Sequence, residues 1–257
     1  MKHKNPLFMT TIFITGWCLL YPATLFSSEE TLMPPQNEYV ILLHGLGRSD
    51  YSMKKMASYL SEKGYQTLNV DYPSTQKPIE QIATDHILPA VNELKARGAK
   101  KIHFVTHSLG GIVLRQYLQD NDLPQGSRAV MLAPPNHGSE LADFLKENPI
   151  YKWIIGPSGQ QVGTDETSIP NRLKPVNIDV GVITGDKDSL PVFASLFPVP
   201  NDGKVSVESA KLSEMKAFKI ISCGHTFIMN RKDVMEDVDH FFQSGIFKTK
   251  DESMISR

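Results

Sequence analysis

The sequence predicts an α/β fold, with a mostly parallel central sheet covered by helices on both faces. Two observations carry this prediction. Short runs of apolar residues recur along the chain, as in strands that are buried on both faces. Amphipathic helical periods separate these runs, and such alternation is typical of a parallel sheet, because each helix returns the chain to the start of the next strand.

Six segments have the composition of buried strands. They span residues 39–43, 66–70, 102–106, 129–133, 180–184 and 218–222. Four further segments have the apolar period of a helix, and Gly64, Gly98 and Gly245 are the stop residues of the first, second and last of them. These helices are expected over residues 50–60, 78–94, 108–117 and 232–243.

The composition fits a globular domain. The chain has 257 residues, of which 40% are hydrophobic and 21% charged, and this excludes a disordered, a collagen-like and a polytopic membrane protein. Lys and Arg number 27 against 28 Asp and Glu, so no excess of positive charge points to nucleic acid as a partner. Beyond residue 28 the chain contains one cysteine, Cys223, which excludes an intramolecular disulfide and a cysteine-based zinc site there.

The first 28 residues have the order of a secretory signal. Lys2 and Lys4 precede an uncharged apolar stretch over residues 5–28, and acidic residues follow it. Ser27 and Ser28 are small, but the residues at the −3 positions, Leu25 and Phe26, are bulky. Because the stretch is also near membrane-spanning length, an uncleaved anchor is the alternative. We therefore expect a signal peptide or signal anchor over residues 1–28 and the folded domain over residues 29–257. The expected location is secreted or periplasmic, or else membrane-anchored.

The most specific motif is Thr106-His107-Ser108-Leu109-Gly110-Gly111, between the third predicted strand and its helix. A serine flanked by small residues at such a junction fits the nucleophile elbow, G-x-S-x-G, in which a sharp turn exposes the serine oxygen above the sheet. Thr106 replaces the first glycine of that motif, and Gly110 keeps the second. Ser108 is therefore the candidate nucleophile, and a helix-capping serine is the structural alternative.

A serine nucleophile needs backbone donors for the negative oxygen that its attack creates. His44-Gly45-Leu46-Gly47 follows the first predicted strand, which is where such folds supply one of these amides. The start of the helix after Ser108 supplies the other. We therefore expect the oxyanion hole at the amides of Leu46 and Leu109, with His44 orienting the loop rather than acting as a base.

The general base must be one of the eight histidines. His225 follows the last predicted strand, in Ser222-Cys223-Gly224-His225-Thr226, and open α/β sheets place their sites at the carboxyl ends of strands. It is the candidate base. The other histidines outside the N-terminal segment and the oxyanion loop are expected to have other roles. We expect His86 and His103 to be structural and His107 to turn its side chain away from the nucleophile. His137 is expected on the substrate side or as a structural residue, and His240 is expected to be solvated.

The carboxylate that would orient this histidine has more than one candidate. Asp186 and Asp188 stand directly after the strand 180–184, and Asp202 stands in Asn201-Asp202-Gly203-Lys204-Val205. Asp71, after the second strand, precedes Ser108 and fits the order of a triad less well. Because an aspartate on a turn is usually a turn former, these residues alone leave the choice open.

Taken together, five motifs resemble bacterial lipases and esterases of the α/β-hydrolase fold, including the branch related to GPI-inositol deacylases. The motifs are HGLGRS, THSLGG, LAPPNHGSELAD, NDGKVSVESA and GHTFIM, and the resemblance covers most of residues 37–245. In that family the triad order is Ser, Asp, His, which implies Ser108, Asp202 and His225, with Asp186 as the alternative acid. The Pro-Asn-x-Gly-Ser segment at 135–139 typically leads into a lid in this family.

Residues 136–175 interrupt the alternation of strands and helices. A helix-like segment at 139–147 and an apolar one at 151–155 precede a stretch rich in Gly, Ser, Gln and Thr at 156–168. A long irregular excursion from a compact domain is usually functional. We expect a small partial lid here, and a plain surface loop is the alternative.

The resemblance implies a serine hydrolase that cleaves carboxylic esters through an acyl-enzyme, without a metal or other cofactor. An acyltransferase or phospholipase with the same triad is the alternative, and a catalytically silent hydrolase fold that serves in binding is a third hypothesis. The expected partner is a small-molecule or lipid ester, with contact to a membrane or lipid interface. These motifs are shared by lipases, short-chain esterases and amide-active relatives, so they leave the substrate and the oligomeric state open.

Overall fold

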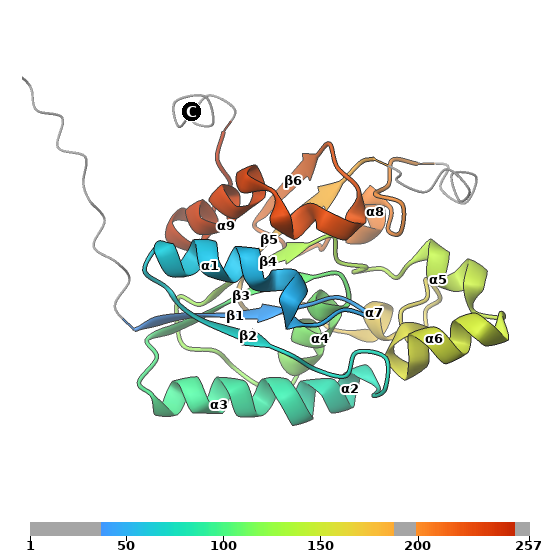
Figure 1. Cartoon of the computed structure of the whole chain (residues 1–257), viewed down its shortest axis with the longest axis horizontal. Helices are drawn as coiled ribbons and strands as arrows, with labels where there is room; N and C mark the ends of the chain where they lie inside the picture. Colours follow the sequence, from blue (N-terminus) through green and yellow to red (C-terminus); the bar gives the residue numbers. More distant parts are fainter. Residues whose placement is uncertain (1–36, 188–198, 250–257) are drawn as a thin grey trace, which may run out of the picture. The chain divides into compact units, whose positions relative to one another are not determined.

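The computed structural model describes residues 37–187 and 199–249. Six strands form one sheet in the order β2-β1-β3-β4-β5-β6, and all five neighbouring pairs are parallel (Figure 1). The strands are β1 Glu38–Leu43, β2 Gln66–Val70, β3 Lys101–His107, β4 Arg128–Leu132, β5 Asp179–Gly185 and β6 Ala217–Ile221. Each overlaps a strand expected from the sequence, so the predicted α/β class is confirmed.

The described helices lie between the strands and after the last one. They are α1 Lys54–Glu62, α2 Ile79–Ile82, α3 Leu88–Ala96, α4 Leu109–Tyr117, α5 Glu140–Leu145, α6 Pro149–Gln160, α7 Ile169–Arg172, α8 Val207–Ala210 and α9 Lys232–Ser244. A π-helical turn, Ala83–Ile87, joins α2 to α3. The expected helix over 78–94 is therefore one continuous run of three helical segments.

Two apolar cores lie on opposite faces of the sheet. Ile41 and Leu43 of β1 pack with residues of α2, α3 and α4, whereas the alternating Val40 and Leu42 pack with residues of α1 and α9. Figure 1 shows α1 and α9 on one side of the strands and α3 on the other. All four of these β1 side chains are fully buried, because helices cover the central strands on both sides.

The outer strands differ from the prediction. The sequence predicts strands buried on both faces at 66–70 and 218–222, but Gln66 of β2 is exposed and the rest of β2 is partly exposed. In β6, Ile220 is 48% exposed. Each of these strands lies at an edge of the sheet, so it has one neighbour instead of two. His240, expected to be solvated, is half-buried with its Nε2 enclosed, because α9 packs on the sheet.

The segment 136–175 is also more regular than predicted. It contains α5, α6 and α7, and α6 continues through residues 156–160, which the sequence placed in an irregular stretch. Gly156 bends this helix with a φ of 62°. A Cβ at this position would lie 1.5 Å from the carbonyl oxygen of Thr75, so glycine lets the bent helix lie directly against the loop after β2.

The chain divides into two compact units, residues 1–33 and residues 34–257. The first unit, and with it the whole of the expected signal peptide or anchor over 1–28, lies outside the described residues. None of the helices that the structure describes has the length and apolar character needed to cross a bilayer.

Candidate active site

The junction between β3 and α4 is a tight, strained turn at Ser108. This residue has φ 52° and ψ −121°, a left-handed backbone conformation that costs free energy for a residue with a Cβ. The Ser108 amide donates to the carbonyl oxygen of Leu132 at 2.9 Å, and its own carbonyl accepts from Gly111 at the same distance. These bonds anchor the turn to β4 and to α4, which gives it the geometry of a nucleophile elbow.

Glycines let other backbone segments approach this turn. A Cβ on Gly110 would lie 2.8 Å from the carbonyl oxygen of Leu43, so α4 rests directly on the end of β1. A Cβ on Gly45 would lie 3.2 Å from the Cβ of Ser108. Thr106, which replaces the first glycine of the motif, fits as a fully buried residue of β3.

Ser108, His225 and Asp202 form one hydrogen-bonded line. Oγ of Ser108 lies 3.0 Å from Nε2 of His225, and Nδ1 of His225 lies 2.8 Å from Oδ2 of Asp202. The other oxygen of Asp202 accepts the backbone N–H groups of Lys204 and Val205 at 3.0 and 2.9 Å. Asp202 and His225 are 1% and 4% exposed. The three side chains come from loops after β3, β5 and β6, at the carboxyl edge of the sheet.

The other candidate acids are elsewhere. Asp186 directly follows β5 but is exposed to solvent, and the carboxylate that bonds to His225 is that of Asp202. The side chain of Asp71 is 66% exposed, and its Oδ1 lies 3.3 Å from Nε2 of His44. Asp188 lies outside the described residues.

The two expected oxyanion donors border the same cavity as Ser108. This cavity has a volume of about 240 Å³, and both Leu46 and Leu109 line it. Leu109 is the first residue of α4, where a backbone N–H has no acceptor within its own helix. A hydrogen bond fixes the loop that contains Leu46, because the backbone amide of the next residue, Gly47, donates to Oγ of Ser74 at 3.0 Å.

His44 stabilises the oxyanion loop from its buried side. Its ring stacks on Tyr72 with 4.0 Å between centroids. Nδ1 donates to the carbonyl oxygen of Gly45 at 2.9 Å, and Nε2 accepts the amide of Tyr72 at 3.3 Å. Burial lowers the pKa of His44, which keeps the ring in the neutral form that can both donate and accept. These contacts orient the loop, as the sequence predicts.

His107 is a member of the site that the sequence placed elsewhere. Its side chain was expected to turn away from the nucleophile, but it lines the same cavity and packs on His225 with 5.0 Å between ring centroids. Nε2 donates to the carbonyl oxygen of His225 at 3.0 Å. Burial, together with the neighbouring His225, lowers the pKa of His107 well below its usual value. His107 is therefore neutral, and its hydrogen bond and ring contact hold His225 in position.

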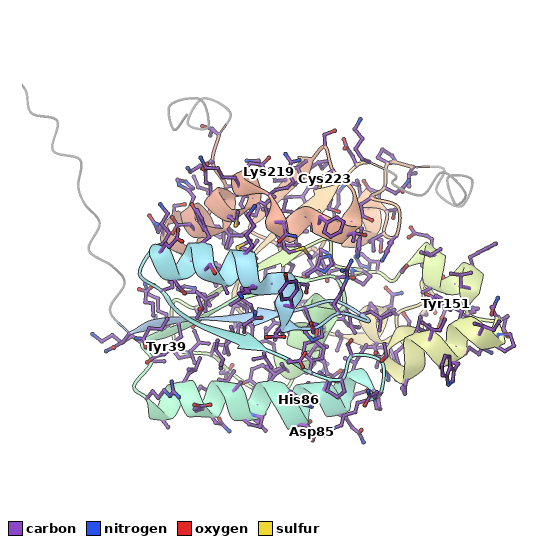
Figure 2. The ribbon with its side chains drawn as sticks, viewed as in Figure 1. Tyr39, Asp85, His86, Tyr151, Lys219 and Cys223 are labelled. Carbon is purple, nitrogen blue, oxygen red and sulfur yellow. The ribbon has the colours of Figure 1, made fainter. Side chains whose placement is uncertain are left out.

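The rest of the cavity divides into an apolar and a basic part. The apolar side chains come from α5, α6 and the residues after them: Leu141, Ala142, Tyr151, Ile154, Ile155 and Val162. Figure 2 shows Tyr151 on α6, and burial raises the pKa of its hydroxyl. The basic part is formed by Arg48 and Lys204, neither of which was singled out from the sequence. His137, expected on the substrate side or as structural, is exposed, and its Nδ1 lies 3.3 Å from Oδ1 of Asn171.

Within the described ranges, no three His, Cys, Asp or Glu side chains are grouped in a way that would hold a metal ion. The residues that line the cavity offer hydroxyl, imidazole, ammonium and guanidinium groups. This set suits nucleophilic attack and the binding of anions.

Comparison with known proteins identifies the family of the chain. The model of the Alpha/beta hydrolase family matches residues 40–232. The chain belongs to this family. Among curated proteins, none matches the chain. The predicted relation to the GPI-inositol deacylases stays a prediction.

Solved structures of several bacterial hydrolases share the fold. The Bacillus licheniformis lipase BlEst2 in its mature form is 21% identical, with a TM-score of 0.63 over 82% of this chain and 94% of that one. The metagenomic carboxyl esterase MGS0156 is 16% identical, with a TM-score of 0.64 over 81% and 76%. Phospholipase PlaB from Legionella pneumophila is 18% identical, with a TM-score of 0.59 over 80% and 57%. At these identities the likeness shows the fold, and the family membership supports hydrolase activity.

Proposed function

We propose that this α/β hydrolase cleaves carboxylic esters, with Ser108 as the nucleophile, His225 as the general base and Asp202 as its orienting acid. The observation that carries the proposal is the continuous hydrogen-bonded line from Ser108 Oγ through His225 to Asp202, beside a cavity. A nucleophile within hydrogen-bond reach of a base, itself oriented by a third group, is the arrangement that acyl transfer requires.

In the first half of the reaction, Ser108 Oγ attacks the ester carbonyl carbon while His225 Nε2 takes the hydroxyl proton. The amides of Leu46 and Leu109 hold the negative oxygen of the tetrahedral intermediate. This intermediate collapses to an acyl-enzyme, and the alcohol leaves with the proton from His225. In the second half His225 deprotonates a water molecule, which attacks the acyl carbon, frees the carboxylic acid and restores Ser108. Asp202 keeps the Nδ1 proton of His225 in place throughout.

The apolar part of the cavity is suited to the acyl chain. Leu141, Ile155 and Val162 border it, and burying each methylene of a substrate against such side chains contributes about 0.8 kcal/mol. The outer surface of the same segment is also apolar, with Trp153 85% and Ile150 70% exposed. We propose that residues 136–175 form a lid that contacts a lipid interface when a long-chain ester is bound.

The proposed location, secreted or periplasmic with membrane anchorage as the alternative, rests on residues 1–28. Cell fractionation tests it, with a chain shortened near residue 29 expected outside the cytoplasm. Intact chain in the membrane fraction selects the anchor, whereas intact chain free in the cytoplasm contradicts export.

A series of p-nitrophenyl esters from acetate to palmitate tests the proposed activity, with the wild type and Ser108→Ala compared at equal concentration. We expect hydrolysis by the wild type, with a maximum at one acyl length, and a loss of about 10³ to 10⁶ in kcat for Ser108→Ala. Absence of hydrolysis across the whole series, together with a folded protein by circular dichroism, would instead indicate a silent fold that serves in binding.

A further inference from the structure

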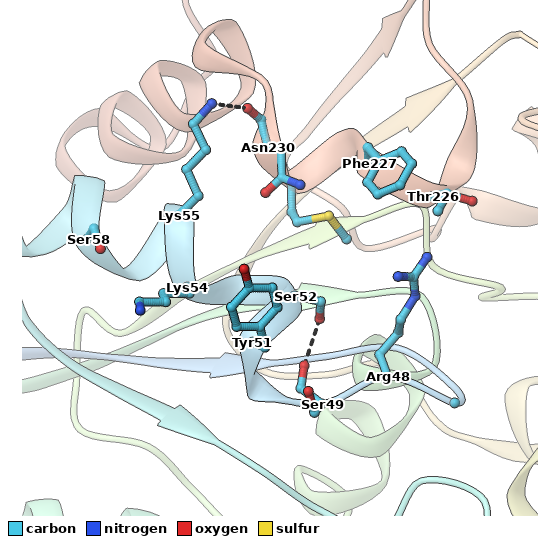
Figure 3. A pocket seen from close by; sticks show the side chains of 12 residues that line it. Arg48, Ser49, Tyr51, Ser52, Lys54, Lys55, Ser58, Thr226, Phe227 and Asn230 are labelled. Carbon is cyan, nitrogen blue, oxygen red and sulfur yellow. Dashed lines mark hydrogen bonds between the residues drawn. The ribbon is translucent and has the colours of Figure 1, made fainter.

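A second cavity adjoins the one that holds Ser108. It has a volume of about 1010 Å³ and lies between the residues around the start of α1 and the 3-10 segment His225–Asn230 (Figure 3). Gly47, Arg48 and Thr226 line both cavities. These three residues therefore form the boundary between the site of the proposed chemistry and the neighbouring space.

Positively charged side chains border both cavities. Arg48 borders both cavities, Lys204 borders the Ser108 cavity, and Lys54 and Lys55 border the second one. The described residues that line the two cavities include no Asp or Glu. Several neutral hydrogen-bonding side chains accompany the cations in the second cavity: Ser49, Ser52, Ser58, Thr226 and Asn230.

Arg48 and Lys204 differ from Arg128 and Arg231 in lacking a carboxylate partner among the described residues, and they share this with several other cations, Lys54 and Lys55 among them. Arg128 bonds to Asp179 and Arg231 to Asp233, but within residues 37–187 and 199–249 no acidic side chain lies within ion-pair distance of Arg48 or Lys204. Arg48 instead lies with its guanidinium 5.8 Å from the ring centroid of Phe227, and Figure 3 shows it directed toward Phe227 and Thr226.

The two charges act on each other. Lys204 is half-buried, and burial, followed by the positive charge of Arg48, lowers the pKa of its ammonium group. The negative charge of Asp202 opposes this shift, but that carboxylate already accepts two backbone amides and bonds to His225. An anion bound beside Arg48 and Lys204 would further reduce the repulsion between the two like charges. Such perturbed groups in a cleft are typical of functional sites.

We propose that Arg48 and Lys204 hold a phosphate group carried by the alcohol part of the substrate. The acyl chain then lies in the apolar part of the first cavity, and the alcohol extends past Arg48 toward the second one. This inference rests on the proposed ester hydrolysis and narrows it to acyl esters of phosphate-bearing alcohols, the class that includes lysophospholipids. The reaction breaks the acyl carbon–oxygen bond and leaves the phosphate intact, so the products are a carboxylic acid and a phosphorylated alcohol.

The test compares two esters that differ only in this group, an acylglycerol and the corresponding acylglycerol 3-phosphate. Both carry the acyl chain preferred among the p-nitrophenyl esters, and both are used below their micelle concentrations. The readout is the ratio of kcat/KM for the phosphorylated ester to kcat/KM for the neutral one. We expect a ratio of about ten or more for the wild type, because hydrogen bonds to a charged group contribute more than neutral ones.

Substitutions test which residues cause the preference for the phosphorylated ester. Arg48→Gln and Lys204→Gln should each lower the ratio by about tenfold, and Arg48→Glu should lower it further. Lys100→Gln makes the same change of charge at an exposed lysine next to the amino end of β3, away from the site, and should leave the ratio unchanged. A wild-type ratio near one, or equal ratios in the wild type and both Gln variants, overturns the proposal.

Two further comparisons separate the sources of a phosphate preference. Glycerol 3-phosphate should inhibit hydrolysis of the neutral ester competitively in the wild type and much less in Arg48→Gln, which supports a site for the phosphate itself. If the preference exists only on vesicles of anionic phospholipid, and soluble esters show none, charge attraction to the surface explains it and the site proposal is wrong. If the wild type hydrolyses neither these esters nor any p-nitrophenyl ester, it is the proposed function that has failed.

Discussion

Replacing Asp202 by Asn should inactivate the enzyme without unfolding it. One oxygen of Asp202 accepts the amides of Lys204 and Val205 at 3.0 and 2.9 Å, and the other lies 2.8 Å from Nδ1 of His225. In the variant the single amide oxygen must keep the two backbone donors, so the NH₂ group faces Nδ1. The ring then carries its proton on Nε2, 3.0 Å from Ser108 Oγ, where it can no longer accept one.

This change of tautomer should lower kcat by about 10⁴ at neutral pH. The assay is steady-state hydrolysis of a p-nitrophenyl ester by Asp202→Asn and by the matched control Asp186→Asn, with melting curves for both. Asp186 is exposed, so its variant should lose less than about tenfold. The reasoning is refuted if Asp186→Asn is the inactive variant while Asp202→Asn retains activity at unchanged thermal stability.

Three other outcomes follow from the structure. Gly110→Ala places a Cβ 2.8 Å from the Leu43 carbonyl oxygen and should destabilise the fold by about 1–3 kcal/mol in urea unfolding; an unchanged midpoint would show that α4 can move. The folded protein lowers the pKa values of His44, His103 and His107. Below the ordinary histidine pKa of about 6.5, the unfolded chain therefore binds more protons than the folded chain. Stability should therefore fall as the pH decreases from 7 to 5, and a flat profile contradicts this. Amide exchange in α5 and α6 should be faster than in the strands and slow when a long-chain phosphonate is bound; equal exchange in both states favours a static surface segment.

The elbow and the sheet could be predicted because their determinants are local. Ser108 lies between a continuous apolar run and a helical period, and the glycines after it allow the close packing that the turn requires. The strand order and the partial exposure of β2 and β6 could not be predicted in the same way. They depend on which strands become neighbours. The segment Gln66–Val70, although three of its five residues are polar, does not by itself identify its neighbour in the sheet.

The segment after β4 shows a different limit. The sequence places residues 156–168 in an irregular stretch, but α6 bends at Gly156 and continues to Gln160. The bend lies directly against the backbone of Thr75, from the loop after β2, where only glycine fits. A contact between residues so far apart in the chain leaves no local pattern.

The proximity of Arg48 and Lys204 cannot be predicted from the sequence for the same reason. Arg48 stands in the loop after β1, and Lys204 stands two positions after Asp202, so neither forms a charge run. Folding places them beside one cavity, where the charge of Arg48 lowers the pKa of Lys204. Lys204 could have been noticed from its place in the Asp-Gly-Lys-Val motif, but nothing in the sequence pairs it with Arg48.

The central claim is that catalysis passes through an ester on Ser108. Intact-mass spectrometry after incubation with a p-nitrophenyl alkylphosphonate, followed by peptide mapping, measures this directly. The account predicts one phosphonyl group per chain, located on the peptide that contains Ser108, with loss of activity in proportion to labelling and no adduct on Ser108→Ala. Labelling of a different residue, or full activity in the labelled protein, would contradict it.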